Sequence, residues 1–144
     1  MHGKQNGFTL IEVLIVVVIM AVLAATILPQ FGSSTEDAKD SQVEYNLHIL
    51  QTQIELYRAH HLGQYPAITG NLQALTVKTN LDGTTTGTPN FGPYVLEIPI
   101  NGRTGIATVS ASTTGTERTG GGWLYNATTG RIWADDITTP EEEN

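Results

Sequence analysis

The sequence predicts an α+β fold in which one long amino-terminal helix packs on a small antiparallel β-sheet. Three observations predict it: a nearly continuous apolar run, a stretch with apolar side chains at helical spacing, and short β-forming runs separated by glycine-rich turns. The expected segments, in order, are a short leader (1–7), an apolar helix (8–28), its amphipathic continuation (29–62), a β-rich globular domain (63–139) and an acidic tail (140–144).

The apolar run is long enough to cross a membrane. Of the 21 residues from Phe8 to Leu28, 18 are apolar. At about 1.5 Å per residue such a helix is about 31 Å long, which matches the ~30 Å hydrocarbon core of a bilayer. Lys4 precedes the run, and Glu36 and Asp37 follow it, so the positive-inside rule places the amino terminus in the cytoplasm. A buried core helix of a soluble domain is the alternative.

Three kinds of membrane segment compete for this run: a cleaved secretory signal, a plain anchor and a specialised leader. A secretory signal has a 7–15-residue apolar core followed by a small-x-small site. Here the core is longer, and Ala24-Ala25 lacks the second small partner. Glu12 also argues against it, because a carboxylate at mid-bilayer costs roughly 2.5–3.5 kcal/mol and such residues usually have a functional partner. These observations disfavour the secretory signal and leave the plain anchor and the specialised leader open.

The residues that carry a family resemblance are Gly7-Phe8-Thr9-Leu10-Ile11-Glu12, followed by the apolar residues 13–17. This stretch resembles the processing and methylation motif of type IV prepilins and of the pseudopilins of type II secretion systems. The resemblance implies that a membrane-embedded prepilin peptidase cuts between Gly7 and Phe8 and methylates the new amino terminus of Phe8. Gly7 suits a scissile position because it has no side chain and permits an extended backbone.

Glu12 is predicted to be an assembly determinant. Cleavage would leave a cationic amine on Phe8, and Glu12 lies one helical turn further along. When helices pack side by side, Glu12 of one subunit can neutralise the amine of an incoming one, and two charges that are costly apart in lipid become tolerable together. The alternative is a glutamate that reaches the membrane surface or becomes protonated.

The helix is expected to bend, loosen or end at Pro29, which has no amide hydrogen. Helical periodicity then resumes, and Gly63 is expected to stop the helix in a left-handed conformation. The predicted core-facing stripe has spacings of 4, 3, 4, 3 and 4 and consists of Val43, Leu47, Leu50, Ile54, Tyr57 and His61.

Four β-forming runs follow, at residues 94–98, 105–110, 122–126 and 131–134. The last two are expected to form a hairpin, because the linker between them ends in Gly130, which suits a left-handed turn position. The result would be a three- or four-stranded antiparallel sheet on the carboxy-terminal half of the helix, an arrangement that the family resemblance also implies.

Composition excludes several classes of function. The net charge of −7 comes from 7 Lys/Arg against 14 Asp/Glu, and the basic residues are scattered, which excludes a nucleic-acid partner. The absence of cysteine excludes disulfides and thiol chemistry. Glycines 120–122 lack a following Lys-Ser/Thr and are expected to form a loop before a strand. The sequence shows no catalytic constellation, so the protein is not expected to be an enzyme.

No metal or cofactor is expected, although calcium stays open. His48, His60 and His61 lack metal-ligand spacing and are expected to be helix-end and surface histidines. Asp135-Asp136 and the glutamates at 141–143 could bind calcium through oxygen ligands. The resemblance implies a calcium site in the carboxy-terminal loop of major pseudopilins, but this sequence lacks the usual Asp-Gly-rich run.

Further segments resemble the major pseudopilin of type II secretion: Tyr65-Pro66, Gly92-Pro93-Tyr94 and Gly122-Trp123-Leu124-Tyr125. The resemblance implies a bacterial inner-membrane protein with a periplasmic domain that forms a filament assisting protein export across the outer membrane. Its partners would be further copies of itself, the prepilin peptidase, minor pseudopilins, the inner-membrane assembly platform and membrane lipid. One alternative is a subunit of a type IV or DNA-uptake pilus. Another is a membrane-anchored module that binds carbohydrate through Trp123 and Trp133.

Overall fold

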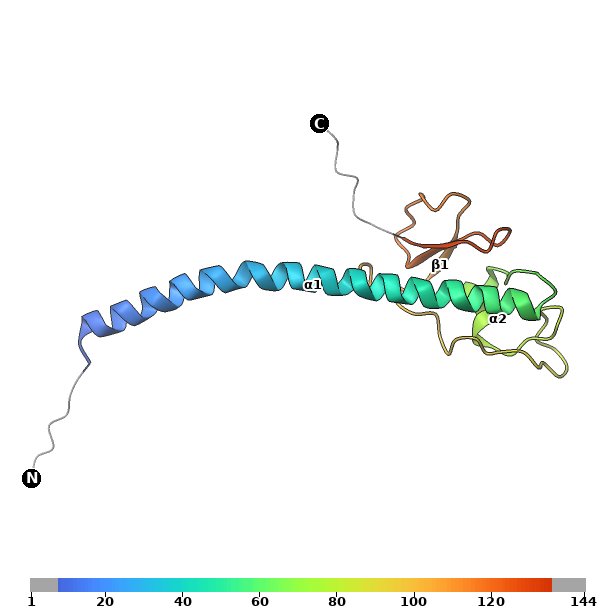
Figure 1. Cartoon of the computed structure of the whole chain (residues 1–144), viewed down its shortest axis with the longest axis horizontal. Helices are drawn as coiled ribbons and strands as arrows, with labels where there is room; N and C mark the ends of the chain where they lie inside the picture. The colour runs from blue at the N-terminus through green and yellow to red at the C-terminus, as the bar shows by residue number, and fades with distance from the viewer. Residues whose placement is uncertain (1–7, 136–144) are drawn as a thin grey trace, which may run out of the picture. The chain divides into compact units, whose positions relative to one another are not determined.

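The computed structural model describes residues 8–135, without the side chains of 26–34. The leader (1–7) and the acidic tail (140–144) therefore lie outside the described residues. Helix α1 spans Leu10–His60 and continues through Pro29 (Figure 1). The helix does not end at this proline, since the loss of one amide donor leaves the backbone on both sides helical. The chain divides into two compact units, Met1–Ala38 and Lys39–Asn144.

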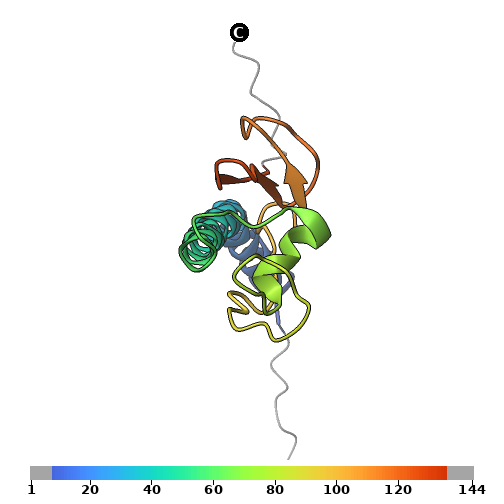
Figure 2. The ribbon, with the colours of Figure 1, turned by 90° about the vertical axis from the view of Figure 1, so that its right-hand side faces the viewer.

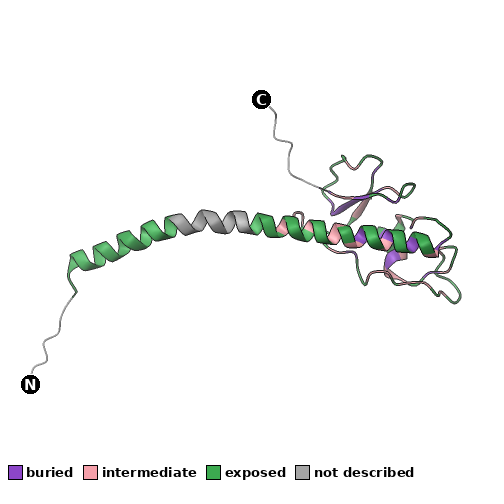
Figure 3. Ribbon diagram, viewed as in Figure 1, coloured by how far each residue is buried: buried purple, intermediate pink, exposed green. Residues whose placement is uncertain are grey.

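In the first unit, residues 10–25 of α1 are mostly apolar and all exposed (Figure 3). Each large apolar side chain from Leu10 to Leu23 is at least 52% exposed. Within the residues that the structure describes, no helix combines the length and the apolarity that a membrane crossing requires. The run expected to cross a membrane, 8–28, ends inside the stretch whose side chains are not described.

The second unit is built around one side of the carboxy-terminal part of α1. Figure 2, which looks along this helix, shows the strands and the short helix α2 (Thr69–Thr76) on the same side of it. The buried stripe of α1 is the predicted one: Val43 and Leu47 are partly buried and the remaining members are buried. The hydrophobic core consists of Leu50, Ile54, Tyr57, Leu72, Leu75, Ile98, Trp123, Tyr125 and Ile132.

Helix α1 ends in a left-handed turn that involves two residues. Leu62 has φ 56° and Gly63 has φ 81°, and the Gly63 amide donates to Arg58 O at 3.0 Å. Gly63 thus takes the expected left-handed conformation, which already begins at Leu62. A bond from the second residue after the helix cap, here Gly63, back to the last helical turn is typical of the Schellman motif.

The sheet has three strands in the order β1 (Val109–Ala111), β2 (Trp123–Tyr125) and β3 (Ile132–Ala134). The predicted β2–β3 hairpin is confirmed: these strands are antiparallel, and Gly130 in their turn has φ 70°. Strands β1 and β2 are parallel, so the expectation of a purely antiparallel sheet was wrong.

The segment 112–122 explains the parallel pairing, because it carries the chain back to the beginning of β1. The amides of Gly122 and Trp123 both donate to Thr108 O, at 3.0 and 2.9 Å. The strand expected at 94–98 does not form. The amides of Tyr94 and Val95 bond to Leu75 O at the end of α2 instead of to a strand.

Candidate processing and assembly site

The first turn of α1 contains a reciprocal pair of residues, Thr9 and Glu12. The Thr9 amide and the Thr9 hydroxyl both donate to Glu12 Oε2 at 2.8 Å. In return, the Glu12 amide donates to Thr9 Oγ1 at 3.3 Å. This is a capping box, in which a threonine before the helix and a glutamate three residues later satisfy amides that have no partner inside the helix.

The capping role of Thr9 was not among the predictions, although the sequence contains its signal. A threonine followed three residues later by glutamate, directly before an apolar run, is the sequence signature of a capping box. Its geometry gives Glu12 a role within its own chain in addition to the predicted role between chains. The carboxylate is therefore held in a fixed position relative to the first turn of α1.

Phe8 lies next to this pair and is 86% exposed. An open groove of about 590 Å³ is lined by Phe8, Glu12, Val13, Ile15 and Val16. Glu12 is thus the one charged residue that lines the groove, and the other lining side chains are apolar. Gly7, the other residue of the expected cleavage site, lies outside the described residues, so the cleavage position remains a prediction.

Asp135 is the candidate calcium ligand that the structure describes. It is fully buried, and its Oδ2 accepts hydrogen bonds from the Thr119 amide, the Thr119 hydroxyl and the Gly121 amide at 3.0, 2.6 and 2.9 Å. Its carboxylate thus fastens the segment that returns the chain to β2. Within residues 8–135, no group of three or more metal-ligating side chains comes together. Asp136 and the glutamates at 141–143 lie outside the described residues.

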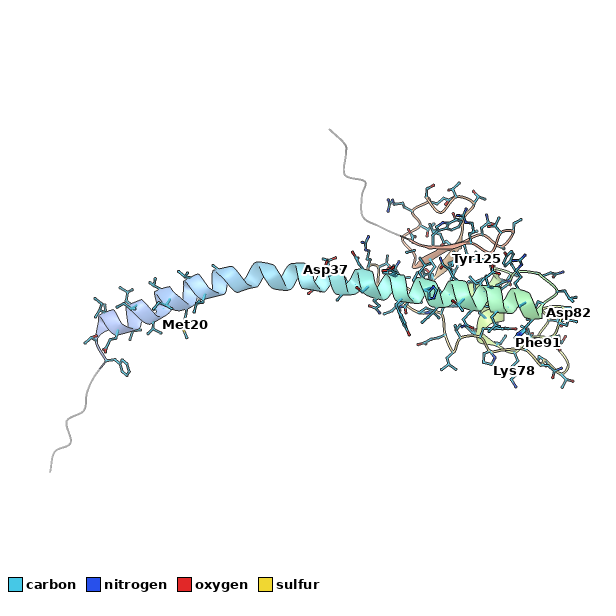
Figure 4. The ribbon with its side chains drawn as sticks, viewed as in Figure 1. Met20, Asp37, Lys78, Asp82, Phe91 and Tyr125 are labelled. Atoms are coloured by element: carbon cyan, nitrogen blue, oxygen red, sulfur yellow. The ribbon has the colours of Figure 1, made fainter. Side chains whose placement is uncertain are left out.

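The expectation of surface histidines was wrong for His61, which is 1% exposed. Its Nδ1 lies 2.7 Å from Tyr57 O, which can only accept, so Nδ1 donates there and Nε2 bonds the Thr79 hydroxyl at 2.9 Å. The His61 ring stacks on Tyr57 at a centroid distance of 3.7 Å. Phe91 lies at the same end of α1 (Figure 4) and contacts the His61 ring edge-on.

The two tryptophans do not form an open binding platform. Trp123 is fully buried, and its Nε1 donates to Pro99 O at 2.7 Å. Trp133 is partly buried, with Gly115 against its ring and the Arg131 guanidinium 5.7 Å from its centroid. Trp123 is thus a core residue, and the carbohydrate-binding alternative loses one of its two aromatic side chains.

Known proteins resemble this chain in two respects: a family motif matches its amino-terminal segment, and relatives align with about two thirds of its length. Residues 2–28 match the family described as the prokaryotic N-terminal methylation motif. The type II secretion system core protein G of Pseudomonas aeruginosa is 31% identical over 103 residues, covering 68% of each chain. The core protein G of Dickeya chrysanthemi is 29% identical, covering 69% of this chain and 63% of the relative.

A third relative gives the same result. The core protein G of Klebsiella pneumoniae is 30% identical over 96 residues, covering 67% of both chains. No solved structure matches this chain significantly. The methylation motif, the helix that begins within it and the shared identity lead to one conclusion: the chain belongs to the type II secretion system core protein G family, the major pseudopilins.

Proposed function

We propose that the chain is a structural subunit of the periplasmic filament of a type II secretion system and assists protein export across the outer membrane. The observation that carries the proposal is the methylation motif at residues 2–28, within which a helix with exposed apolar side chains begins. Membership of the core protein G family supports the same role, since its relatives are structural pseudopilins.

Maturation would take place in the bacterial inner membrane. A prepilin peptidase would cut between Gly7 and Phe8 and methylate the new amino terminus of Phe8. Before assembly, the segment 8–28 would cross the membrane once and contact lipid, with the amino terminus in the cytoplasm and the carboxy-terminal domain in the periplasm. An inner-membrane assembly platform and minor pseudopilins would then join the subunit to further copies of itself.

The geometry of the first turn explains how Glu12 would act in assembly. The two bonds that the carboxylate accepts from Thr9 both end on Oε2, so they fix the position of the carboxylate without using Oε1. The methylated amine of a neighbouring Phe8 could then bond Oε1 beside the apolar groove. Pairing the two charges removes the cost of keeping each one unpaired in an apolar surrounding.

Two substitutions separate the charge of Glu12 from its capping role. Glu12→Gln keeps an acceptor for the Thr9 amide and removes the charge, whereas Glu12→Val removes both. We expect both variants to insert into the membrane and to be missing from sheared filaments. Normal filament incorporation of Glu12→Gln would show that the charge is not required.

Mass spectrometry of the membrane-extracted protein tests the maturation step. We expect a chain that begins with N-methylated Phe8. An intact Met1, or a chain that begins near Thr26, would contradict the proposal. Deletion of the gene should stop protein export. Loss of surface fibres with export unchanged would point to a type IV pilus subunit instead.

A further inference from the structure

Helix α1 has a second apolar side in the carboxy-terminal unit, distinct from the side that faces the core. Tyr45, Ile49, Thr52, Leu56 and Ala59 are spaced 4, 3, 4 and 3, so they share one side of the helix. Tyr45 is 68% and Leu56 42% exposed, while Ile49 is partly buried. None of the five carries a charge, so this side of the helix offers an approaching surface only apolar and neutral groups.

The segment from Tyr94 to Ile100 runs beside α1 next to this side (yellow to orange in Figure 1). Tyr94 Oη lies 3.1 Å from His60 Nδ1, and the Asn46 amide side chain donates to Ile100 O at 2.9 Å. From Tyr94 to Ile100 an extended chain spans about 20 Å, and from His60 to Asn46 the helix spans about 21 Å. The segment therefore runs antiparallel to α1 in a nearly extended form.

Two large apolar side chains of this segment point outward. Val95 and Ile98 pack against the core, but Leu96 between them is 93% exposed and Ile100 is 50% exposed. By its distance along the extended segment, Leu96 lies level with the helical turn that contains Leu56. We call the combined surface the outer apolar patch, and it consists of Tyr45, Ile49, Leu56, Leu96 and Ile100.

The charges of α1 lie on a different side. The acidic residues Asp40, Glu44 and Glu55 are spaced 4 and 11 and therefore share one side of the helix. This side faces β3 and the β2–β3 turn, since Glu44 lines a pocket with Ala134 and Glu55 lines one with residues 129–133. Asp40 pairs with Arg103 at 2.5 Å, and Glu55 accepts from the Tyr65 hydroxyl at 3.3 Å. Because the chain carries a net charge of −7, two copies repel least where their surfaces are uncharged.

We propose that the outer apolar patch is an interface with a neighbouring copy of this chain in the filament. The inference rests on the proposed function, because a filament of one subunit surrounds each copy with further copies related by the same operation. Leu96 is 93% exposed, so its apolar surface leaves water only when a partner covers it. The α1 half of the patch carries no charge, and the exposed Glu97 follows Leu96 directly, so an apolar centre borders a charged residue as at the rim of a protein interface.

The test uses cysteine accessibility in the full-length protein. The chain contains no cysteine, so Leu96→Cys and Leu56→Cys each introduce a unique thiol. A membrane-impermeant maleimide is applied to the membrane-inserted subunit and to isolated filaments. The matched control is Leu81→Cys, because Leu81 is 48% exposed and lies outside the patch. We expect the patch thiols to react roughly tenfold more slowly in filaments than in the inserted subunit, because interface cores exclude water.

Each outcome bears on the proposal. Equal reaction of Leu96→Cys in both states would show that the patch stays open and would overturn it. Protection already in the inserted subunit would overturn it too, since lipid or another protein would then cover the patch. Leu96→Glu should reduce sheared filaments about tenfold while Leu81→Glu does not, because a charge in an interface core is costly. If even the Leu81→Cys chain forms no filament, the proposed function fails rather than the patch.

Discussion

Thr9 and Glu12 hold each other at the start of α1, with hydrogen bonds that run in both directions between them. The residue predicted to pair with a neighbouring subunit is therefore also part of a cap on its own helix. This pairing fixes the direction in which the carboxylate faces before any neighbour arrives. Loss of the cap and loss of the charge can be examined separately, because each partner can be changed alone.

The first prediction concerns the cap. Thr9→Ala removes the hydroxyl and should loosen the first turn, whereas Thr9→Ser keeps it. A lost cap of this kind should speed amide hydrogen exchange at residues 10–13 roughly fivefold in lipid or detergent. Filament assembly should fall as well, because the Glu12 carboxylate loses one of its two bonds. Identical exchange in the alanine and serine variants would contradict a capping role for the hydroxyl.

The second prediction concerns Asp135, whose Oδ2 accepts three hydrogen bonds from Thr119 and Gly121. Asp135→Ala should lower the free energy of unfolding by about 3 kcal/mol, because it leaves buried donors without an acceptor. Asp135→Asn should lose less, since its amide oxygen can still accept. Urea unfolding of the full chain in detergent measures both changes.

Asp82→Ala is the matched control for that measurement. Asp82 is also a loop carboxylate that accepts from a threonine amide and hydroxyl, those of Thr84, but it is exposed. Water replaces the lost acceptor at an exposed site, so the control should be clearly less destabilised. An equal loss in both variants would mean that Asp135 does not fasten the segment before β2.

Local patterns predicted the features that depend on neighbours along the chain. The stripe from Val43 to His61 follows from the helical period, and the β2–β3 hairpin follows from a glycine at the end of its turn. The outer apolar patch has the same helical period on α1. Its other half, Leu96 and Ile100, becomes visible only when the structure shows that their segment runs beside the helix.

The features that could not be predicted depend on residues far apart in the sequence. The parallel pairing of β1 with β2 requires the amides of Gly122 and Trp123 to reach Thr108 O. The hydrogen bond of His61 Nε2 likewise requires Thr79, 18 residues away. No local period encodes such contacts, and a polar ring on an apolar stripe does not reveal that its bonds will be satisfied.

The third prediction concerns the pH dependence of the loop that precedes β2. Hydrogen bonds, foremost that from the Ser112 hydroxyl, lower the pKa of Glu117 to about 2, from an ordinary value of 4.5. Because the folded-state pKa is the lower one, the stabilisation is fully present above pH 4.5 and is lost as the pH falls towards 2. Ser112→Ala should therefore raise the pKa of Glu117 towards its ordinary value, which a carboxyl NMR titration measures.

Asp82 provides an internal reference in the same titration. Its pKa is lowered by hydrogen bonds from the Thr84 hydroxyl and amide, which Ser112→Ala does not touch. The pKa of Asp82 should thus stay unchanged while that of Glu117 rises. A Glu117 pKa that stays near 2 in the variant would show that the Ser112 hydroxyl is not the main cause of the shift.

The last prediction concerns the contact between Gly130 and Tyr65, which joins the β2–β3 turn to the segment after α1. A β-carbon at residue 130 would overlap the Tyr65 ring, and residue 130 also has φ 70°. Gly87 has φ 86° but open space around it, so Gly87→Ala measures the backbone cost alone. We expect a loss of about 1 kcal/mol for Gly87→Ala and about 3 kcal/mol for Gly130→Ala in urea unfolding.

The double variant Tyr65→Ala/Gly130→Ala tests whether the difference comes from this contact. Tyr65 also receives the Arg58 guanidinium 4.9 Å from its centroid, so its removal costs stability independently. If the clash is the cause, adding Gly130→Ala to the Tyr65→Ala chain should cost only about as much as Gly87→Ala, and the two substitutions will not be additive. Full additivity would mean that the turn, and not the tyrosine ring, rejects a side chain at residue 130. The contact would then play no part in holding the hairpin against the end of the helix.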